Sequence, residues 1–184
     1  MRTDAARNRD QILAAARALI AAQGPDVSMD AIAEAAGVAV GTLYRHHPTK
    51  ALLVSAVIED SLGRFADAAE LSAQAVQGGA DALTELAALF ATYAEQHAQD
   101  RALKAASSVL GVPEPDDVTS YPAGSAAHRA GTAVGSLLDA ARTAGTVRPD
   151  LTLDDLTMLL AAMPDGAAHR ARYVQLMTAA VSTR

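Results

Sequence analysis

The stretch from Ser28 to Lys50 most constrains what this chain can fold into, because it predicts two short helices joined by a tight turn. Ser28 suits the N-cap of the first helix, since its hydroxyl can accept a backbone N–H that the first turn leaves unpaired. Gly37 suits the end of that helix, because the sharp exit needs a left-handed backbone that glycine adopts at little cost. Pro48 lacks an N–H donor and ends a second helix at about residues 39–46. Two helices that cross through a Gly-containing turn are the helix-turn-helix pattern, whose second helix enters the DNA major groove.

The outward-facing residues of the second helix suit contact with DNA. They are small at residues 39–41 and polar or aromatic at residues 42–46. Small side chains let the backbone approach base edges, and Ala or Val methyl groups can touch thymine methyls. Tyr44, His46 and Lys50 suit phosphate contacts, which position a protein without reading the base sequence. The alternative is that the apolar and aromatic residues of this helix are ordinary core residues.

The string GVAVGTLYRHHPTKALL, at residues 37–53, is similar to the helix-turn-helix signature of the tetracycline-repressor (TetR) family of bacterial one-component regulators. The similarity is specific over about residues 8–58 and only architectural beyond them. Two positions depart from the family pattern. His47 stands where an aromatic or apolar residue usually packs inward, and Ala39 stands where Ser or Thr often caps the helix. The resemblance implies that the matching positions contact DNA, namely Ser28, Ala39, Val40, Gly41, Thr42, Tyr44, His46 and Lys50.

The composition favours an all-α fold. Hydrophobic residues make up 51% of the 184 residues, which is enough for a substantial core, whereas aromatic residues make up only 3%. Alanine is frequent, and no convincing alternation of Val, Ile, Thr and aromatic residues predicts a strand. We therefore expect about nine helices in two parts. Residues 1–50 are predicted to form a three-helix, helix-turn-helix DNA-binding domain, and residues 51–184 a helical effector-binding and dimerisation domain.

Apolar periodicity and capping signals place these helices along the chain. Asp81 and Asp100 are suited to cap two successive helices, and Thr152 with Asp155 resembles a capping box in which Asp replaces the usual Glu. Residues 2–8 are expected to be disordered, and residues 111–124 to form one long loop. The helices are expected at about residues 9–23, 28–36, 39–46, 49–76, 81–97, 100–110, 125–144, 152–163 and 165–181.

Several classes of protein are disfavoured. The chain has no cysteine, which excludes disulfides, thiol catalysis and thiolate metal sites. The first ten residues are charged and lack the apolar run of a signal peptide. No segment approaches the roughly 20 uninterrupted apolar residues that a membrane-spanning helix needs. We therefore expect a cytoplasmic protein with no membrane association.

The net charge of −6 opposes DNA binding at first sight, but the charge is unevenly distributed. Residues 1–50 carry six Lys or Arg against five Asp or Glu, whereas residues 51–184 carry nine against sixteen. The predicted DNA-binding part is therefore weakly basic, and the remainder is acidic. Affinity for DNA should depend on dimerisation and should fall as the salt concentration rises.

No motif predicts an enzyme. Five His and many carboxylates are present, but there is no HExxH, no paired Glu-x-x-His, no nucleophile motif and no phosphate-cradling Gly loop. Asp165 and His169 lie one turn apart, as metal ligands can, yet a third ligand is not apparent and a solvated helix face is the simpler interpretation. We expect no catalytic residues, no metal and no cofactor.

The last two helices, preceded by the linker GTVRPDLTLDDL, resemble the dimerisation helices of the same family. Paired with their symmetry mates, such helices form a four-helix bundle about a two-fold axis. A dimer also has a physical reason, because two recognition helices about 34 Å apart can bind a palindromic site that one helix could not hold. The alternative is burial of the apolar stripes within one subunit. The stripe of the last helix is Tyr173, Val174, Met177, Ala180 and Val181.

The middle helices are expected to enclose a pocket for a small molecule, since such sites are mostly apolar with a few polar groups. His97 and His128 could instead be surface histidines or hydrogen-bonded core histidines. The residues predicted to line the pocket are Phe65, Phe90, Tyr93, His97, Leu110 and His128, with Tyr121 in addition.

Together these inferences predict a ligand-responsive transcriptional regulator that binds a double-stranded DNA operator as a homodimer through its last two helices. A ligand that fits a conformation incompatible with the half-site spacing weakens DNA binding by the same factor as DNA weakens ligand binding. We expect a repressor that a small, mostly apolar effector releases from its operator; the resemblance implies repression, although the family also contains activators. The alternative is a constitutive helix-turn-helix dimer without effector response.

Overall fold

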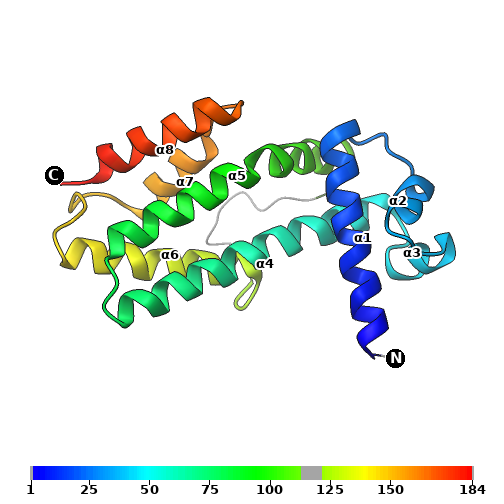
Figure 1. Ribbon diagram of the computed structural model, residues 1–184, viewed down its shortest axis with the longest axis horizontal. Helices are drawn as coiled ribbons and strands as arrows, with labels where there is room; N and C mark the ends of the chain where they lie inside the picture. The colour runs from blue at the N-terminus through cyan, green and yellow to red at the C-terminus, as the bar shows by residue number, and fades with distance from the viewer. Residues whose placement is uncertain (1, 113–121, 184) are drawn as a thin grey trace. The chain divides into compact units, whose positions relative to one another are not determined.

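The computed structural model describes residues 2–112 and 122–183, and within them it is helical, as predicted. One isolated antiparallel bridge joins Val147 to Ser182. No helix of the described residues is long and apolar enough to cross a membrane. The eight α-helices of the described residues are α1 (Arg2–Gln23), α2 (Met29–Ala35), α3 (Val40–His46), α4 (Lys50–Gln77), α5 (Ala82–Val109), α6 (Ala126–Thr143), α7 (Leu153–Ala161) and α8 (Ala167–Val181) (Figure 1).

Side-chain caps begin four of the helices where the sequence predicted a helix to start. The hydroxyls of Ser28 and Ser125 and a carboxylate oxygen of Asp81 each accept the backbone N–H of the residue three positions later. At the start of α7, the Thr152 N–H donates to the Asp155 carboxylate at 2.8 Å, and the Asp155 N–H donates to the Thr152 hydroxyl at 3.1 Å. This reciprocal pair is a complete capping box.

Two helix boundaries differ from the prediction. Residues 2–8 are helical and belong to α1, because Ala and Arg are strong helix formers and extending a packed helix needs no new nucleus. The helix predicted to begin at Asp100 does not exist, since α5 continues through that residue to Val109. An Asp favours an N-cap only where the chain enters a helix, and neither Gly nor Pro interrupts the residues before it.

The chain forms two compact units, and both α4 and α5 contribute to each of them. Unit 1 comprises Met1–Ser61 and Gln99–Pro115, and unit 2 comprises Leu62–Ala98 and Asp116–Arg184. The sequence predicts a single boundary at residue 50, where α4 begins, whereas unit 1 continues to Ser61 and also includes the end of α5. Unit 1 therefore holds the first three turns of α4 and the last part of α5 in addition to the three N-terminal helices.

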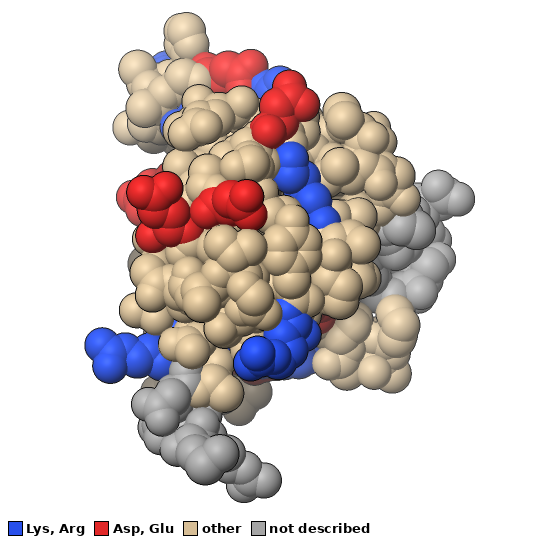
Figure 2. Space-filling view, turned by 90° about the vertical axis from the view of Figure 1, so that its right-hand side faces the viewer, with Lys and Arg blue, Asp and Glu red and all other residues tan. Residues whose placement is uncertain are grey.

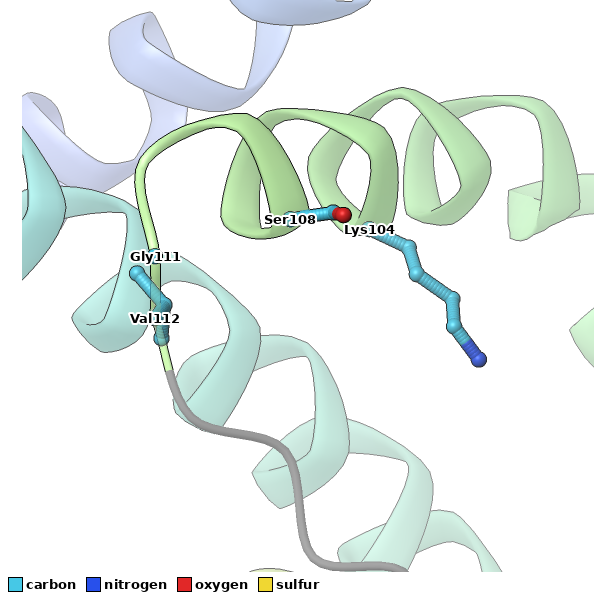
Figure 3. Close-up of a pocket in the computed structure, with 4 residues that line it drawn as sticks. All are labelled: Lys104, Ser108, Gly111 and Val112. Carbon is cyan, nitrogen blue, oxygen red and sulfur yellow. The ribbon is translucent and has the colours of Figure 1, made fainter.

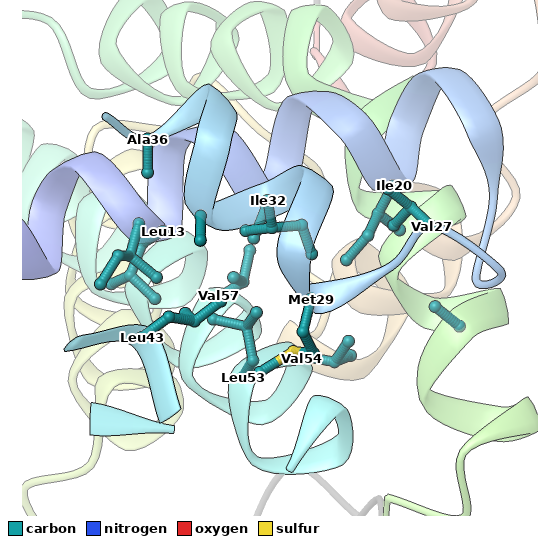
Figure 4. Close-up of a cluster of buried hydrophobic side chains, with 14 of the residues drawn as sticks. Leu13, Ile20, Val27, Met29, Ile32, Ala36, Leu43, Leu53, Val54 and Val57 are labelled. Carbon is teal, nitrogen blue, oxygen red and sulfur yellow. The ribbon is translucent and has the colours of Figure 1, made fainter. Parts of the chain in front are cut away.

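The core of unit 1 is a cluster of aliphatic side chains from five helices (Figure 4). Helix α1 supplies the largest share, and α3 supplies one residue, Leu43. Leu103 and Ala106 of α5 are also buried in this cluster, which is why the end of α5 belongs to unit 1. The fully buried large side chains of this core are Ile12, Leu13, Ile20, Ile32, Leu43, Leu53, Val54, Val57 and Leu103.

Unit 2 corrects the predicted role of the stripe on the last helix. Met177 and Val181 are buried against Leu137, Leu138 and Leu156 in the core of their own subunit. Tyr173 and Val174 pack against the same core, and only Ala180 of the predicted stripe is exposed. The neighbouring face is different: Leu176 is 52% exposed, whereas Met177 is 4% exposed. The stripe therefore holds α8 on its own unit, which is the alternative that the sequence left open.

Candidate nucleic-acid interface

The turn between α2 and α3 is built as the sequence predicts. Gly37 has a positive φ of 66°, which side chains other than that of glycine rarely tolerate. Its N–H donates to the Glu34 carbonyl at 3.0 Å, and the Val38 N–H donates to the Ala33 carbonyl at 3.1 Å. These two bonds form a Schellman motif that pairs carbonyls left over at the end of α2. The turn therefore sets the direction in which α3 leaves.

One buried residue decides which side of α3 faces the solvent. Leu43 is fully buried and points into the core of unit 1 among Leu13, Leu53 and Val57 (Figure 4). Because α3 has only seven residues, burying Leu43 turns the opposite side outward. Tyr44 is 45% exposed. The solvent-facing second helix that the sequence predicted is therefore present.

The eight predicted DNA-contacting residues all belong to unit 1 and all have solvent access. Thr42 and Lys50 are partly exposed. The α3 helix starts without a side-chain cap, because Ala39 has no group that can accept a hydrogen bond. The six residues of the set that are exposed are Ser28, Ala39, Val40, Gly41, Tyr44 and His46.

Lys50 is held by the fold. Its ammonium donates a hydrogen bond to the Pro25 carbonyl at 2.5 Å, which connects the start of α4 to the turn after α1. An ammonium has three N–H donors, so two remain for a phosphate oxygen. Beside it, the Thr49 hydroxyl accepts the Leu52 N–H at 3.2 Å and caps α4. The sequence suggested the phosphate contact of Lys50, but it gave no signal for the bond to Pro25.

His47 occupies the inward position that the family usually gives to an aromatic or apolar residue. It is 8% exposed, and its Nε2 atom has no hydrogen-bond partner among the described residues. Its backbone N–H donates to the Leu43 carbonyl at 2.8 Å and ends α3. Burial lowers the pKa of His47 below the usual 6.5, and the nearby His46 and Arg9 lower it further. Burial therefore disfavours the charged form of this imidazole.

The charges on this side of the protein are mixed. Figure 2, which views the side where α1, α2 and α3 lie, shows a largely uncharged surface with separate groups of basic and acidic residues. Asp26, Asp30 and Glu34 are exposed and four residues apart along α2 and the residues before it. Arg9 lies 3.8 Å from Asp10. A phosphate backbone would therefore meet only a small number of favourably placed cations on this surface.

The aromatic residues predicted to line an effector pocket come together in unit 2. The ring centroids of Phe65 and Tyr93 are 5.9 Å apart, and those of Tyr93 and His97 are also 5.9 Å apart. Phe90 and His97 are buried. These four residues lie on α4 and α5.

The other predicted pocket residues are placed differently. His128 is exposed on α6, and Leu110 packs against the core of unit 1, whereas the aromatic residues belong to unit 2. Tyr121 lies outside the described residues. An open hollow on unit 1 is lined by Lys104, Ser108, Gly111 and Val112, at the end of α5 and just after it (Figure 3). It contains none of the predicted pocket residues.

Among the residues that the structure describes, no three His, Asp or Glu side chains come together as metal ligands would. Asp165 and His169, the pair that the sequence singled out, lie beside the start of α8, and both are exposed.

Family models match both parts of the chain. Residues 12–57 match the model described as bacterial regulatory proteins, tetR family. Residues 81–181 match the model described as transcriptional regulator SbtR-like, C-terminal domain. No curated protein matches the chain.

Solved structures with a similar fold extend over almost the whole chain. The TetR transcription regulatory protein from Mycobacterium vanbaalenii is 34% identical, with 99% of each chain covered and a TM-score of 0.73. The TetR transcriptional regulator SCO0520 from Streptomyces coelicolor is 28% identical, with 96% of this chain and 99% of that chain covered and a TM-score of 0.67. A gamma-butyrolactone receptor described as an ArpA-like protein is 24% identical, with 95% and 85% covered and a TM-score of 0.61, and is similar in fold.

The buried His47 predicts a pH dependence of folding stability. Because its folded-state pKa lies below the usual 6.5, the unfolded chain takes up a proton at this residue at a higher pH than the folded chain. The stability that depends on neutral His47 is fully present above pH 6.5. It is lost as the pH falls from 6.5 toward the folded-state pKa of His47. His47→Phe should remove this part of the pH dependence, measured as the free energy of urea unfolding between about pH 5 and pH 8.

His46→Phe is the matched control, because His46 is the exposed neighbour of the same type. It should keep the larger part of the pH dependence, because burial is the main cause of the lowered pKa of His47 and the charge of His46 adds a smaller part. The explanation would be wrong if His47→Phe and the parent lost stability equally toward acid.

Proposed function

The chain belongs to the tetR family of bacterial regulatory proteins, and from this premise we propose that it is a cytoplasmic, homodimeric repressor which a small, mostly apolar effector releases from a palindromic operator. The observation that carries the proposal is the placement of α3. Burial of Leu43 turns Tyr44 and the small residues before it to the solvent, so the helix can enter a major groove. The eight residues from Ser28 to Lys50 named above are the proposed DNA contacts.

The dimer is proposed to form through the exposed faces of α7 and α8. Met158 of α7 and Leu176 of α8 are large apolar side chains with more than half of their surface exposed. An exposed alanine follows each of them three residues later, Ala161 after Met158 and Ala179 after Leu176. Small side chains allow helices to approach closely, and a two-fold axis would bring the same face from both subunits together. This face replaces the Met177 stripe as the proposed interface.

The effector is proposed to bind beside the aromatic residues of unit 2. The rings of Phe65, Tyr93 and His97 follow one another across α4 and α5, and Phe90 is buried nearby. Such a lining, apolar with a small number of polar groups, suits a small apolar molecule. A gamma-butyrolactone receptor has a similar fold, which supports an effector of this general kind. His128 of unit 2 remains a proposed contact, whereas Leu110 packs in unit 1 and is not included in this site.

The aromatic contacts also favour a second candidate function. Rings at 5.9 Å separation already pack against each other, as residues of an ordinary core do. A dimer whose core is filled in this way would bind DNA constitutively and would not respond to an effector. A compound that changes operator affinity would exclude this candidate, whereas a broad set of small apolar compounds without effect would support it.

Selection of bound sequences from random duplex DNA tests the proposed function. We expect a palindrome whose half-sites are separated by about one helical turn or a multiple of it, because each subunit presents one α3. Enrichment of a sequence without two-fold symmetry would contradict the proposed dimer. No enrichment at all would contradict specific DNA binding.

The two lysines of the chain provide a matched test of the interface. Lys50→Met removes an ammonium at the start of α4 and should weaken binding to all duplex sequences, with the salt slope reduced by about one. Lys104→Met removes an ammonium beside the hollow on α5 and should change neither quantity. Binding isotherms at several salt concentrations would measure both. If Lys50→Met bound DNA as Lys104→Met does, the start of α4 would not lie on the phosphate backbone.

Two adjacent residues of α8 provide a matched test of the dimer interface. Leu176→Asp places a charge on an exposed face and should give folded monomers with poor operator affinity. Met177→Asp places a charge in the core and should lower the free energy of unfolding by at least about 2 kcal/mol. Sedimentation velocity and urea unfolding would separate the two effects. Folded Leu176→Asp protein that stays dimeric would place the interface elsewhere.

A further inference from the structure

Arg17 is a buried charged residue inside unit 1, where aliphatic side chains otherwise dominate. It lies on α1 and is 8% exposed. Its guanidinium donates to the Asp60 carboxylate at 2.8 Å and to the Ser61 hydroxyl at 3.3 Å. A third, longer contact of 3.5 Å reaches the Val57 carbonyl. All three partners lie on α4, more than 39 residues away in the sequence.

These hydrogen bonds are directional, whereas the hydrophobic effect that drives burial of the surrounding side chains is not. A guanidinium is planar and carries its donors at fixed angles, so bonds to two side chains define how α1 is rotated on α4. A buried ion pair often contributes little net stability, because both charges lose their hydration. The same pair can still select one arrangement of the packed helices over others of similar energy. Arg17 is therefore placed to determine geometry more than stability.

The orientation of α3 depends on the two helices that Arg17 joins. Leu43 of α3 packs among Leu13 of α1 and Leu53 and Val57 of α4 (Figure 4). Leu13 lies one turn before Arg17 on α1, and Val57 lies one turn before Ser61 on α4. A change in the angle between α1 and α4 would therefore move the site that holds Leu43, and α3 with it.

We propose that Arg17 is a positioning residue for DNA recognition, whose bonds to Asp60 and Ser61 hold α1 at one angle on α4 and so fix the orientation of the DNA-reading helix α3. Its consequence for DNA rests on the proposed function: a dimer with fixed α3 helices accepts one half-site spacing and rejects others. Without these bonds, the apolar contacts would keep the unit folded but would allow several angles between the two helices.

A second arginine, whose partners also lie on α4, provides a matched control. In unit 2, Arg129 of α6 bonds to Glu70 at 2.6 Å and to Asp67 at 2.6 Å, both on α4. The side chain of Arg129 is 37% exposed, compared with 10% for that of Arg17. The variant pair Arg129→Met with Glu70→Leu therefore removes an ion pair of the same chemistry from α4 without altering the contact between α1 and α4.

The test variant is Arg17→Met with Asp60→Leu, which removes both charges and leaves neither one buried alone. Because the chain has no cysteine, Gln11→Cys on α1 and Ser55→Cys on α4, both at exposed positions, can be spin-labelled selectively. Dilution with unlabelled protein removes distances between subunits. We expect one narrow distance distribution in the labelled parent and in the Arg129 control, and a broadened or displaced distribution in the test variant.

Arg17→Lys provides a second variant if the double replacement fails to fold. Lysine keeps the charge near Asp60 but cannot make the same two directed bonds, so a smaller broadening is expected. A narrow, parent-like distribution in a folded Arg17→Met/Asp60→Leu variant, or in Arg17→Lys if only that variant folds, would overturn the proposal. The melting temperature alone would not test the proposal, because removing an ion pair that only stabilises the fold would change the melting temperature as well.

Operator binding gives the second measurement. The parent and the Arg129 control should lose at least about tenfold in affinity when one base pair is added to or removed from the operator centre, whereas the test variant should lose less than about threefold. A parent-like spacing preference in the folded test variant would overturn the role in DNA recognition. If selection yielded no palindromic operator, the proposed function would fail, while the spin-label distances would still decide whether Arg17 sets the helix angle.

Discussion

Burial of Leu43 is the constraint on which the DNA-reading surface depends. Helix α3 has seven residues, and isolated helices shorter than about 12 residues are marginal in water, so α3 needs tertiary packing to form. Leu43 is its single fully buried side chain and provides that packing. The same contact decides that Tyr44 and the residues at positions 39–41 face the solvent. The formation of the helix and the choice of its exposed face thus have one physical cause.

The position of Leu43 depends in turn on residues distant in the sequence. The core of unit 1 also contains Leu103 and Ala106 of α5, a helix whose first part belongs to unit 2. Helices α4 and α5 are each continuous across the boundary between the units. Each of these two helices therefore contributes residues to both units. Any effector site on α4 and α5 would act on helices that contribute directly to the core around α3.

Local signals in the sequence predicted most of the fold, because their physical cause lies within a few residues. Ser28, Gly37 and the Thr152–Asp155 pair act on the nearest backbone groups, and the structure contains each as predicted. Signals that depend on distant partners were less informative. An Asp at position 100 has the chemistry of a cap, but the α-helix around it continues.

Periodicity likewise identifies an apolar stripe without naming its partner, and for Met177 the partner is the subunit's own core. The residues proposed to contact DNA came from a resemblance as well as from chemistry. Their solvent access agrees with such a role, but their contacts remain predictions. Arg17 illustrates the limit most clearly, because nothing near it in the sequence indicates a partner on α4, more than 40 residues away.

Residues 1–50 have only a small excess of positive charge, and in the structure several of their Lys and Arg side chains already have partners within the protein. Of their six Lys and Arg residues, Arg17 is buried against Asp60, Lys50 is bonded to the Pro25 carbonyl, and Arg9 has Asp10 nearby. Exposed carboxylates on α2 oppose a phosphate backbone further. In the proposed dimer, long-range attraction would therefore contribute little to DNA binding, and affinity would have to come from close contacts made by both subunits. Such a dimer would be sensitive to small changes in helix orientation, so the directed bonds of Arg17 would matter more for the proposed DNA recognition than for stability.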